Sequence, residues 1–256
     1  MLATPARATP SRRSPTPGST GLVLRRPMAD FYSAVDTAIR NQESLIITYE
    51  TDEDAALALL PEADELRLAD PFTAKVVFVK MPATPWGAYN EAYQLIDCTW
   101  DGKPCIYPVR LLVDGDVGLM IGRELWGNPK KFGTIEFYRE SSLLQCTGER
   151  PRGNRIVTAI MHPDTPIEVP TVNMDVLGFR VIPNPEDPST FSLAELLINT
   201  LRVTTTAAWA GQGSLLFNDP SDLDPWYKLP VRKVISSVFT VSDVDTGERA
   251  KIVKRY

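Results

Sequence analysis

Short runs in which apolar and polar residues alternate make up most of the chain after residue 44, and this two-residue period is typical of β-strands. Gly102 after Asp101 predicts a hairpin turn, as does Gly115 between Asp114 and Asp116. The pattern predicts an α+β, mainly β protein with a curved antiparallel sheet or barrel-like core and a few peripheral helices. The predicted strands are residues 45–49, 74–79, 93–99, 105–112, 117–121, 134–138, 155–161, 231–241 and 250–253.

Helical spacing of apolar residues is confined to three segments, residues 30–40, 52–60 and 191–203. Asp52 stands at the N-cap position of the second segment, acidic residues fill its first turn, and Pro61 ends it. Ser192 is placed to cap the third segment. The pattern therefore predicts three short helices beside the strands.

The first 27 residues differ in composition from the remainder of the chain. They contain five prolines and five arginines but no acidic residue, and they offer little apolar surface to bury. We predict a disordered leader over 1–27 and one domain over 28–256. The leader's composition also has some likeness to an organelle transit peptide, which stays the alternative.

Charge and length exclude several classes of function. The formal net charge is −5, and without the five leader arginines the remaining 22 basic and 32 acidic residues give −10. Nucleic-acid binding needs a basic face, so no nucleic-acid partner is expected. No apolar run approaches the roughly 20 residues of a membrane-spanning helix, so no membrane partner is expected.

Histidine and cysteine usage narrows the chemistry further. His162 is the only histidine, so a zinc site with two or three histidines cannot be built, and no metal is expected. Cys98, Cys105 and Cys146 are odd in number and lack a Cys-x-x-Cys spacing, which is typical of buried thiols in a reducing compartment. We therefore predict a cytoplasmic protein.

The segment from Gly122 to Lys131 carries the main chemical signal. It places two adjacent lysines, Lys130 and Lys131, behind a proline and among apolar neighbours that include Trp126 and Phe132. A lysine in water has a pKa near 10.4, so almost none of it is nucleophilic at pH 7. Burial or a nearby cation lowers that value and yields an amine that can attack a ketone. In an extended segment the two side chains would point to opposite faces, which favours burial as the main cause.

The same segment resembles the signature of the acetoacetate decarboxylase family, in which Gly-Arg-Glu-Leu is followed by Pro-Lys-Lys. That family is also a standard example of a lysine activated by its surroundings. The stretch Gly87-Ala-Tyr-Asn-Glu91, 39 residues before Lys130, is similar to the family's Gly-x-Tyr-x-Glu element. Further matches follow in order, and the resemblance covers residues 31–256, which is nearly the whole chain after the leader. They are Tyr49-Glu-Thr-Asp52, Leu60-Pro-Glu62, Ala208-Trp-Ala-Gly211, Leu229-Pro-Val231 and Ile235-Ser-Ser237.

The resemblance implies a fold, a cofactor-free mechanism and a set of site residues. The fold is a curved antiparallel sheet closing around a pocket, and the family assembles as homo-oligomers. Lys130 is implied as the Schiff-base lysine with Lys131 in a supporting role, and Glu91 as the pocket acid that moves a proton. Tyr89 and Trp126 are candidates for lining the pocket. Arg123 is a candidate for holding the substrate carboxylate, and a structural ion pair is its alternative.

Two positions depart from the family's pattern. The family's decarboxylases carry a substrate-binding arginine where this chain has Gln42, and a second glutamate where it has Val76. The leading hypothesis is a carbon–carbon lyase that decarboxylates a small 3-oxo acid through an imine and an enamine. The departures keep two alternatives open: an aldolase-dehydratase acting on pyruvate and an aldehyde, and a non-catalytic relative that binds a small ketone or aromatic ligand.

Overall fold

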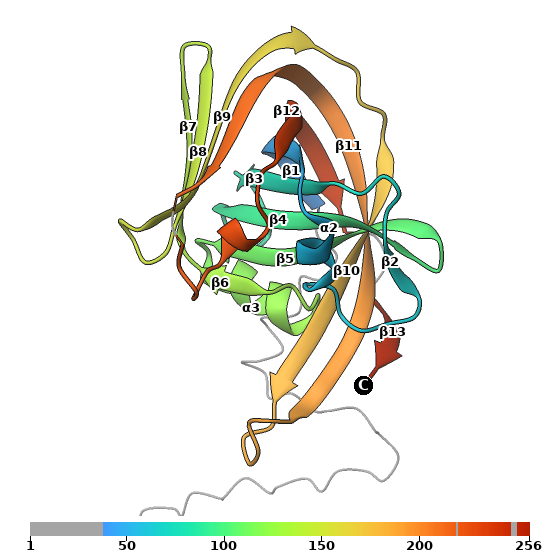
Figure 1. Cartoon of the computed structure of the whole chain (residues 1–256). Coiled ribbons are helices and arrows are strands. Elements are labelled where there is room, and N and C mark those ends of the chain that lie inside the picture. Colours follow the sequence, from blue (N-terminus) through green and yellow to red (C-terminus); the bar gives the residue numbers. More distant parts are fainter. Residues whose placement is uncertain (1–37, 219, 247–249) are drawn as a thin grey trace, which may run out of the picture. The chain divides into compact units, whose positions relative to one another are not determined.

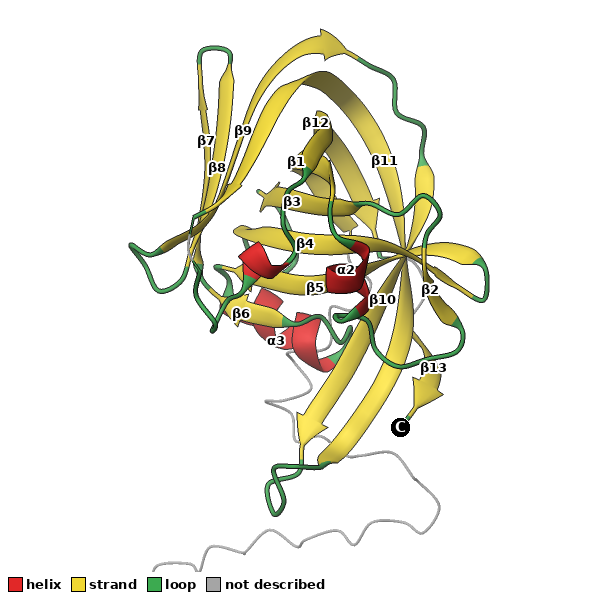
Figure 2. Ribbon diagram, in the orientation of Figure 1, coloured by secondary structure: helices red, strands yellow, loops and turns green. Residues whose placement is uncertain are grey.

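The computed structural model describes residues 38–218, 220–246 and 250–256, and in these residues thirteen strands form one hydrogen-bonded sheet. Two α-helices accompany them, α2 (Glu53–Leu57) and α3 (Asp116–Glu124), with a 3₁₀ turn, η1 (Trp226–Lys228). Figures 1 and 2 show the strands curving around one another, with α2 near the middle of the view and α3 below β5 and β6. The strands are β1 (Ala38–Glu50), β2 (Leu66–Leu68), β3 (Ala74–Met81), β4 (Tyr89–Trp100), β5 (Lys103–Val113), β6 (Lys130–Phe132), β7 (Thr134–Glu140), β8 (Leu143–Glu149), β9 (Arg155–Pro166), β10 (Val172–Pro183), β11 (Phe191–Phe217), β12 (Lys233–Asp245) and β13 (Lys251–Arg255).

Seven strands close into a barrel. Their order is β10-β5-β4-β3-β1-β12-β11, and β11 also pairs with β10, which completes the circuit. All neighbours in this circuit are antiparallel except β5 and β10, which run parallel. The long strand β11 continues past the barrel and pairs with β9, from which β8 and β7 extend, as the arc at the top of Figure 1 shows.

Strand alternation gives the barrel wall two buried faces. On β3 the side chains of Val77 and Val79 face the barrel interior, whereas Val76 and Phe78 are fully buried on the outer side. The outer side packs with β1, β8 and β9 into the main apolar core, and Leu45 and Met161 are among its fully buried members. The barrel interior is thus a lumen separate from the core that stabilises its wall.

Most of the predicted strands are confirmed, and so are the helix at 52–60 and the hairpin at Gly102. Asp101 and Gly102 have φ values of 50° and 74°, as a tight β4–β5 turn requires. Asp52 does occupy the N-cap position of α2, but its carboxylate accepts hydrogen bonds from Arg232 at 2.7 and 2.6 Å rather than capping the helix. The mainly β fold class is confirmed.

Two predicted elements are wrong, and both errors have a physical cause. Residues 117–121 are not a strand after a Gly115 turn; they lie in α3, with Gly115 as its N-cap. Residues 191–203 are not a helix but the first half of β11. Both faces of this strand are covered, so four consecutive residues from Ala194 to Leu197 are buried and the two-residue period is hidden.

The N-terminal predictions fall mostly outside the described residues. The leader over 1–27 and most of the helix over 30–40 lie there. The last three residues of that predicted helix, 38–40, belong to β1 instead. The three cysteines are free and buried, as predicted.

Candidate active site

Lys130 points into the barrel from β6, a short strand that pairs in parallel with β5. Its side chain is 2% exposed, and its ammonium nitrogen donates a hydrogen bond to Oε1 of Glu91. The next residue, Lys131, faces the other way: its side chain is 42% exposed and its Nζ lies 2.9 Å from Oδ1 of Asp224. The predicted division of the two lysines between opposite faces is confirmed.

A glycine on α3 makes the space that Lys130 occupies. A Cβ atom at Gly122 would lie 2.2 Å from Cε and 2.7 Å from Nζ of Lys130, which is closer than atoms can approach. Arg123, the next residue, donates from Nη1 to the backbone carbonyl of Lys130 at 3.0 Å. The Gly-Arg pair of the motif thus fixes the position of the lysine from the helix side.

Glu91 lies on β4 and is 1% exposed. Its second oxygen, Oε2, accepts a hydrogen bond from the hydroxyl of Tyr93, so an amine and a phenol hold the two carboxylate oxygens. Burial raises the pKa of Glu91, and the neighbouring Lys130 opposes this rise without cancelling it. The site therefore contains a buried acid suited to holding a proton close to an amine.

The cavity in front of this pair is the lumen of the barrel, with a volume of about 420 Å³. Its walls are mostly aliphatic. Polar side chains gather on β1 and β12, where Gln42 and Ser44 face Thr240 and Ser242. Such a mostly apolar cavity with a few polar groups is typical of a small-molecule site.

The structure brings four of the predicted pocket residues together with Lys130 and leaves one outside. Glu91, Tyr89, Trp126 and Gln42 line the cavity. Burial raises the pKa of Tyr89, so its hydroxyl stays protonated at neutral pH.

Two of these residues have defined neighbours. Trp126 packs edge-on against Trp86 with ring centroids 6.0 Å apart. The amide of Gln42 donates to the Ser44 hydroxyl at 3.1 Å. Arg123 is exposed and is not among the residues that line the cavity, so its role as a carboxylate ligand has no geometric support.

Reasoning from the sequence missed most of the cavity lining, and three of the missed residues are Tyr93, Lys75 and Asn128. Tyr93 stands two residues after Glu91, and strand alternation alone would have placed both on one face. Lys75 lines the cavity from β3, where it pairs with Asp97. Asn128 lies in the motif itself, and its buried Oδ1 has no hydrogen-bond partner.

The comparison made at Val76 needs a correction. Val76 faces the outer core and not the lumen, so it cannot stand in for a pocket glutamate. The lumen-facing residues on either side of it are Lys75 and Val77. Neither is an acid. The β3 wall of the lumen therefore lacks a second carboxylate, and the evidence for this is Lys75 and Val77 instead of Val76.

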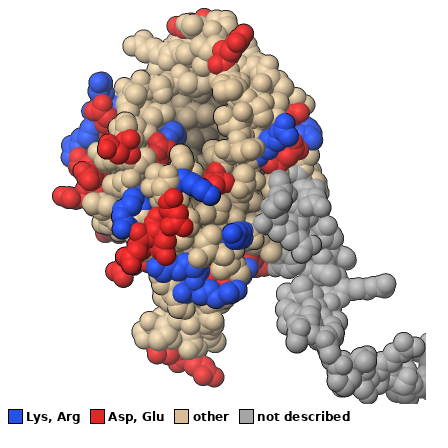
Figure 3. Space-filling view, turned by 90° about the vertical axis from the view of Figure 1, so that its right-hand side faces the viewer, with Lys and Arg blue, Asp and Glu red and all other residues tan. Residues whose placement is uncertain are grey.

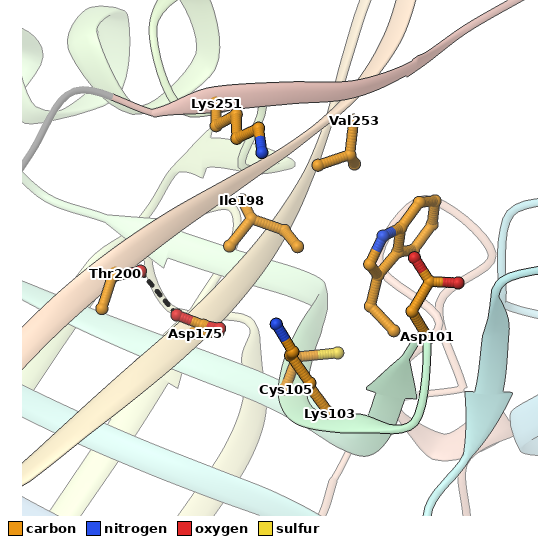
Figure 4. A pocket seen from close by; sticks show the side chains of 9 residues that line it. Asp101, Lys103, Cys105, Asp175, Ile198, Thr200, Lys251 and Val253 are labelled. Atoms are coloured by element: carbon orange, nitrogen blue, oxygen red, sulfur yellow. Dashed lines mark hydrogen bonds between the residues drawn. The ribbon is translucent and has the colours of Figure 1, made fainter.

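A second cavity of about 330 Å³ lies away from the lysine pair, between the β4–β5 hairpin and β13 (Figure 4). Asp101, Lys103, Asp175 and Lys251 line it together with Cys105. Burial raises the pKa of the Cys105 thiol to about 11, so this thiol is not a nucleophile near neutral pH. We therefore assign the chemistry to the lumen.

Metal and membrane features are sparse in the part of the chain that the structure describes. No group of three or more histidine, cysteine or acidic side chains gathers there in a way that would hold a metal ion. None of its helices has the length and apolar content needed to cross a membrane. On the face shown in Figure 3, basic and acidic side chains are interspersed. His162 is exposed on β9. Homo-oligomeric assembly and a cytoplasmic location stay predictions.

Comparison with known proteins gives consistent relatives. Residues 22–256 match the family model described as acetoacetate decarboxylase. Acetoacetate decarboxylase 2 of Mesorhizobium japonicum is 33% identical over 223 residues, which cover 85% of this chain and 83% of the relative. Acetoacetate decarboxylase of Ralstonia nicotianae is 29% identical, with 81% and 84% covered.

Solved structures agree with the fold. A crystal structure of acetoacetate decarboxylase from Legionella pneumophila is 27% identical and superimposes with a TM-score of 0.79, covering 86% of this chain and 88% of that one. The enduracididine biosynthesis enzyme MppR, solved with the condensation product of pyruvate and imidazole 4-carboxaldehyde, has a TM-score of 0.74 at 23% identity, covering 93% of this chain and 97% of that one. At that identity the likeness concerns the fold alone.

Proposed function

Because the chain belongs to the acetoacetate decarboxylase family, we propose that it is a lysine-dependent lyase that decarboxylates a 3-oxo acid through a Schiff base on Lys130. One observation carries the proposal: the Lys130 amine and the Glu91 carboxyl, 2% and 1% exposed, form a hydrogen-bonded pair in the wall of an apolar cavity. Burial of this kind is what makes a lysine usable as a nucleophile.

The first steps need a neutral amine. The raised pKa of Glu91 makes its carboxyl a proton acceptor within reach of Lys130, so the proton can pass from the ammonium to Glu91 inside the cavity. The free Nζ attacks the ketone carbon, and the resulting carbinolamine loses water as Glu91 returns the proton, which gives a protonated imine. The positive imine nitrogen then withdraws electrons from the adjacent carbons.

Carbon–carbon cleavage follows from that electron demand. The bond between the carboxylate carbon and the α-carbon breaks, its electron pair forms the enamine, and CO₂ leaves. Glu91 takes up a proton from water and, held in place by the Tyr93 hydroxyl, is positioned to give that proton to the α-carbon. Water then hydrolyses the imine, which releases the ketone and the free lysine.

The substrate carboxylate meets neutral groups in this cavity. Apart from Lys130, the only cationic side chain that lines the described cavity is Lys75, which is already paired with Asp97. The amide of Gln42 and the hydroxyl of Ser44 line the cavity close in register to Glu91, where they can donate hydrogen bonds to the substrate carboxylate. A weakly held carboxylate in an apolar site favours its loss as neutral CO₂.

Borohydride reduction followed by mass spectrometry tests the proposal. With acetoacetate or a longer 3-oxo acid, we expect a decarboxylated adduct on the peptide that contains Lys130. The Lys131→Met variant should give the same adduct, and Lys130→Met should give none. An adduct on another lysine, or none with any oxo acid, would overturn the proposal.

The absence of an arginine and of a second acid from the lining residues favours one second candidate. In an aldolase-dehydratase the same lysine would take pyruvate, keep its carboxylate and condense the enamine with an aldehyde. A retained-carboxylate adduct from pyruvate, with no CO₂ released from 3-oxo acids, would favour it. Binding of ketones without any trapped adduct would instead indicate a non-catalytic relative.

A further inference from the structure

The two ends of the barrel lumen differ in chemistry. Near Glu91 the lining contains a polar group, with Gln42, Ser44 and Lys130 close in register on β1, β4 and β6, beside apolar residues such as Val79. Toward Lys75 the lining is mostly aliphatic, with the polar Asn199 beside Val176, and its aliphatic residues lie on five different strands. They are Ile46, Val77, Leu95, Ile106, Pro108 and Val176.

The aliphatic part has a measurable length. Glu91 pairs with Val79, and Lys75 lies four residues further along the same strand, β3. At about 3.3 Å per residue this is about 13 Å of strand, or about 10 Å along the lumen when a strand tilt of about 40° is included. A zigzag carbon chain with bonds of about 1.5 Å needs about eight carbons, counted from the ketone carbon, to span it.

The far end carries two charged side chains, 25% and 22% exposed, that neutralise each other. Lys75 donates to Oδ2 of Asp97, and Asp97 also accepts from the Thr73 hydroxyl. Val176 pairs with Ile106, which in turn pairs with Asp97, so these residues sit at the same end. Because the Lys75 charge is neutralised, this end offers no free cation for a second carboxylate.

We propose, resting on the function proposed above, that the preferred substrates are 3-oxo acids with an unbranched, uncharged aliphatic tail of about six to ten carbons in all. The ketone would sit at Lys130 with the carboxylate beside Gln42 and Ser44, and the tail would extend toward Lys75. Acetoacetate has a single methyl group beyond its ketone, which leaves most of the 420 Å³ lumen unfilled.

A chain-length series measures this directly. Straight-chain 3-oxo acids of four to twelve carbons are compared by kcat/KM for CO₂ release. Each added carbon that enters the apolar lumen should raise kcat/KM by up to about fourfold until the lumen is full, after which the value should fall. A maximum at acetoacetate, or no dependence on length, would overturn the inference.

Two variants shorten the lumen at different depths. Val176→Phe narrows the far end and should reduce kcat/KM for the longest acids at least tenfold while sparing acetoacetate. Val77→Phe, midway along β3, should move the optimum to shorter chains still. Val181→Phe, on β10 but outside the lumen lining, is the matched control and should leave the profile unchanged. If both lumen variants unfold at the parental temperature but lose the same fraction of kcat/KM for every chain length, the placement of the tail in the lumen is contradicted.

A binding experiment separates this inference from the proposed function. Saturated carboxylic acids of four to twelve carbons have no ketone, so their affinities by calorimetry report the lumen alone. Suppose that affinity grows with chain length but no borohydride adduct forms. The lumen would then still be assigned as a binding site for aliphatic tails, and the proposed lyase function would be overturned. Adducts with oxo acids, but no dependence on chain length in either series, would support the lyase function and overturn the proposed preference for long aliphatic tails.

Discussion

Lys130 and Lys131 are neighbours in the sequence with opposite surroundings. Lys130 enters the lumen and meets Glu91, where both side chains are at most 2% exposed. Lys131 leaves the barrel on the other side and shares Asp224 with Arg150, at 2.9 and 3.1 Å. Since adjacent strand residues face opposite ways, one dipeptide supplies a buried amine to the cavity and a part-exposed cation to the outer surface.

The difference shows that the surroundings, and not the residue type, decide what each lysine can do. On the outer side a carboxylate with two cations is a structural network in contact with water. In the lumen a single amine faces a single carboxyl whose pKa burial has raised. Burial of both partners favours the uncharged form of the lumen pair, whereas the side chain of Lys131 is 42% exposed.

The sharpest way to break the comparison is to remove each amine in turn. Lys130→Met should reduce kcat/KM at least about 10⁴-fold, because the proposed nucleophile is lost. Lys131→Met should stay within about fivefold of the parent, because a part-exposed ion pair contributes only about 0.2–1 kcal/mol. Steady-state CO₂ release on the best 3-oxo acid is the measurement, and equal losses in both variants would refute the division of roles.

Changing the acid in the lumen should have the next largest effect. Glu91→Gln keeps the shape of the side chain but cannot move a proton, so kcat should fall about 10²- to 10⁴-fold. Tyr93→Phe leaves the acid in place and should cost less, about tenfold or below. A Glu91→Gln enzyme with parental kcat would exclude Glu91 from proton transfer.

The same variant gives a pH test with a defined sign. The pKa of Glu91 is raised above its ordinary 4.5 in the folded protein, so folding favours the protonated acid. Its contribution to the free energy of unfolding is therefore complete below pH 4.5 and is lost as the pH rises through the raised value. Denaturant titrations from pH 4 to 8 should show the wild type losing stability relative to Glu91→Gln. A wild type that gains stability relative to Glu91→Gln as the pH rises would contradict the assignment.

Displacing the amine without removing it should have an intermediate effect. The new methyl group in Gly122→Ala would lie 2.2 Å from Cε of Lys130, so Lys130 must move. We expect about a 10²-fold loss of kcat from misplacement and a stability cost of about 1–3 kcal/mol from overpacking. Gly118→Ala, one turn earlier on α3, contacts Tyr89 at 3.0 Å instead and serves as the control with a smaller loss of activity.

The smallest effect is expected on the outer side, and on stability rather than activity. Asp224 is 4% exposed and pairs with Lys131 and Arg150, so Asp224→Asn should lower the free energy of unfolding by about 2 kcal/mol. The control Asp222→Asn removes a carboxylate that is 86% exposed and should change little. Urea unfolding gives both values, while kcat/KM should stay within about twofold. A large activity loss would show that the outer network acts on the lumen.

Local signals in the sequence predicted that Lys130 and Lys131 face opposite sides, and the family resemblance selected Lys130 as the candidate Schiff-base lysine. Pro129 restricts the backbone where the chain enters β6. The alternation of side chains along this strand then places Lys130 and Lys131 on opposite faces. Glu91 lies 39 residues earlier, and only the family resemblance connected it to Lys130. Its contact with the lysine depends on the pairing of β4, β5 and β6, which no local pattern encodes.

Long-range pairing also explains what sequence reasoning missed. Lys75 becomes a lumen residue because β3 lies beside β4, and its partner Asp97 comes from that neighbouring strand. The first half of β11 has the apolar content of a helix because both of its faces are covered. At α3, a run of apolar residues with two glycines suits either a strand or a helix by composition. The close approach of Tyr89 and Lys130 to those glycines became visible only in three dimensions.

The length of β11 has a consequence for how the protein melts. Its 27 residues pair with β10 and β13 in the first part, with β12 in the middle and with β9 in the last part. No part of the barrel on this side can therefore open without loosening the strand from which β7–β9 extend. Such sharing of one element favours a single cooperative unfolding transition for the described chain, in which the lumen and the outer sheet are lost together.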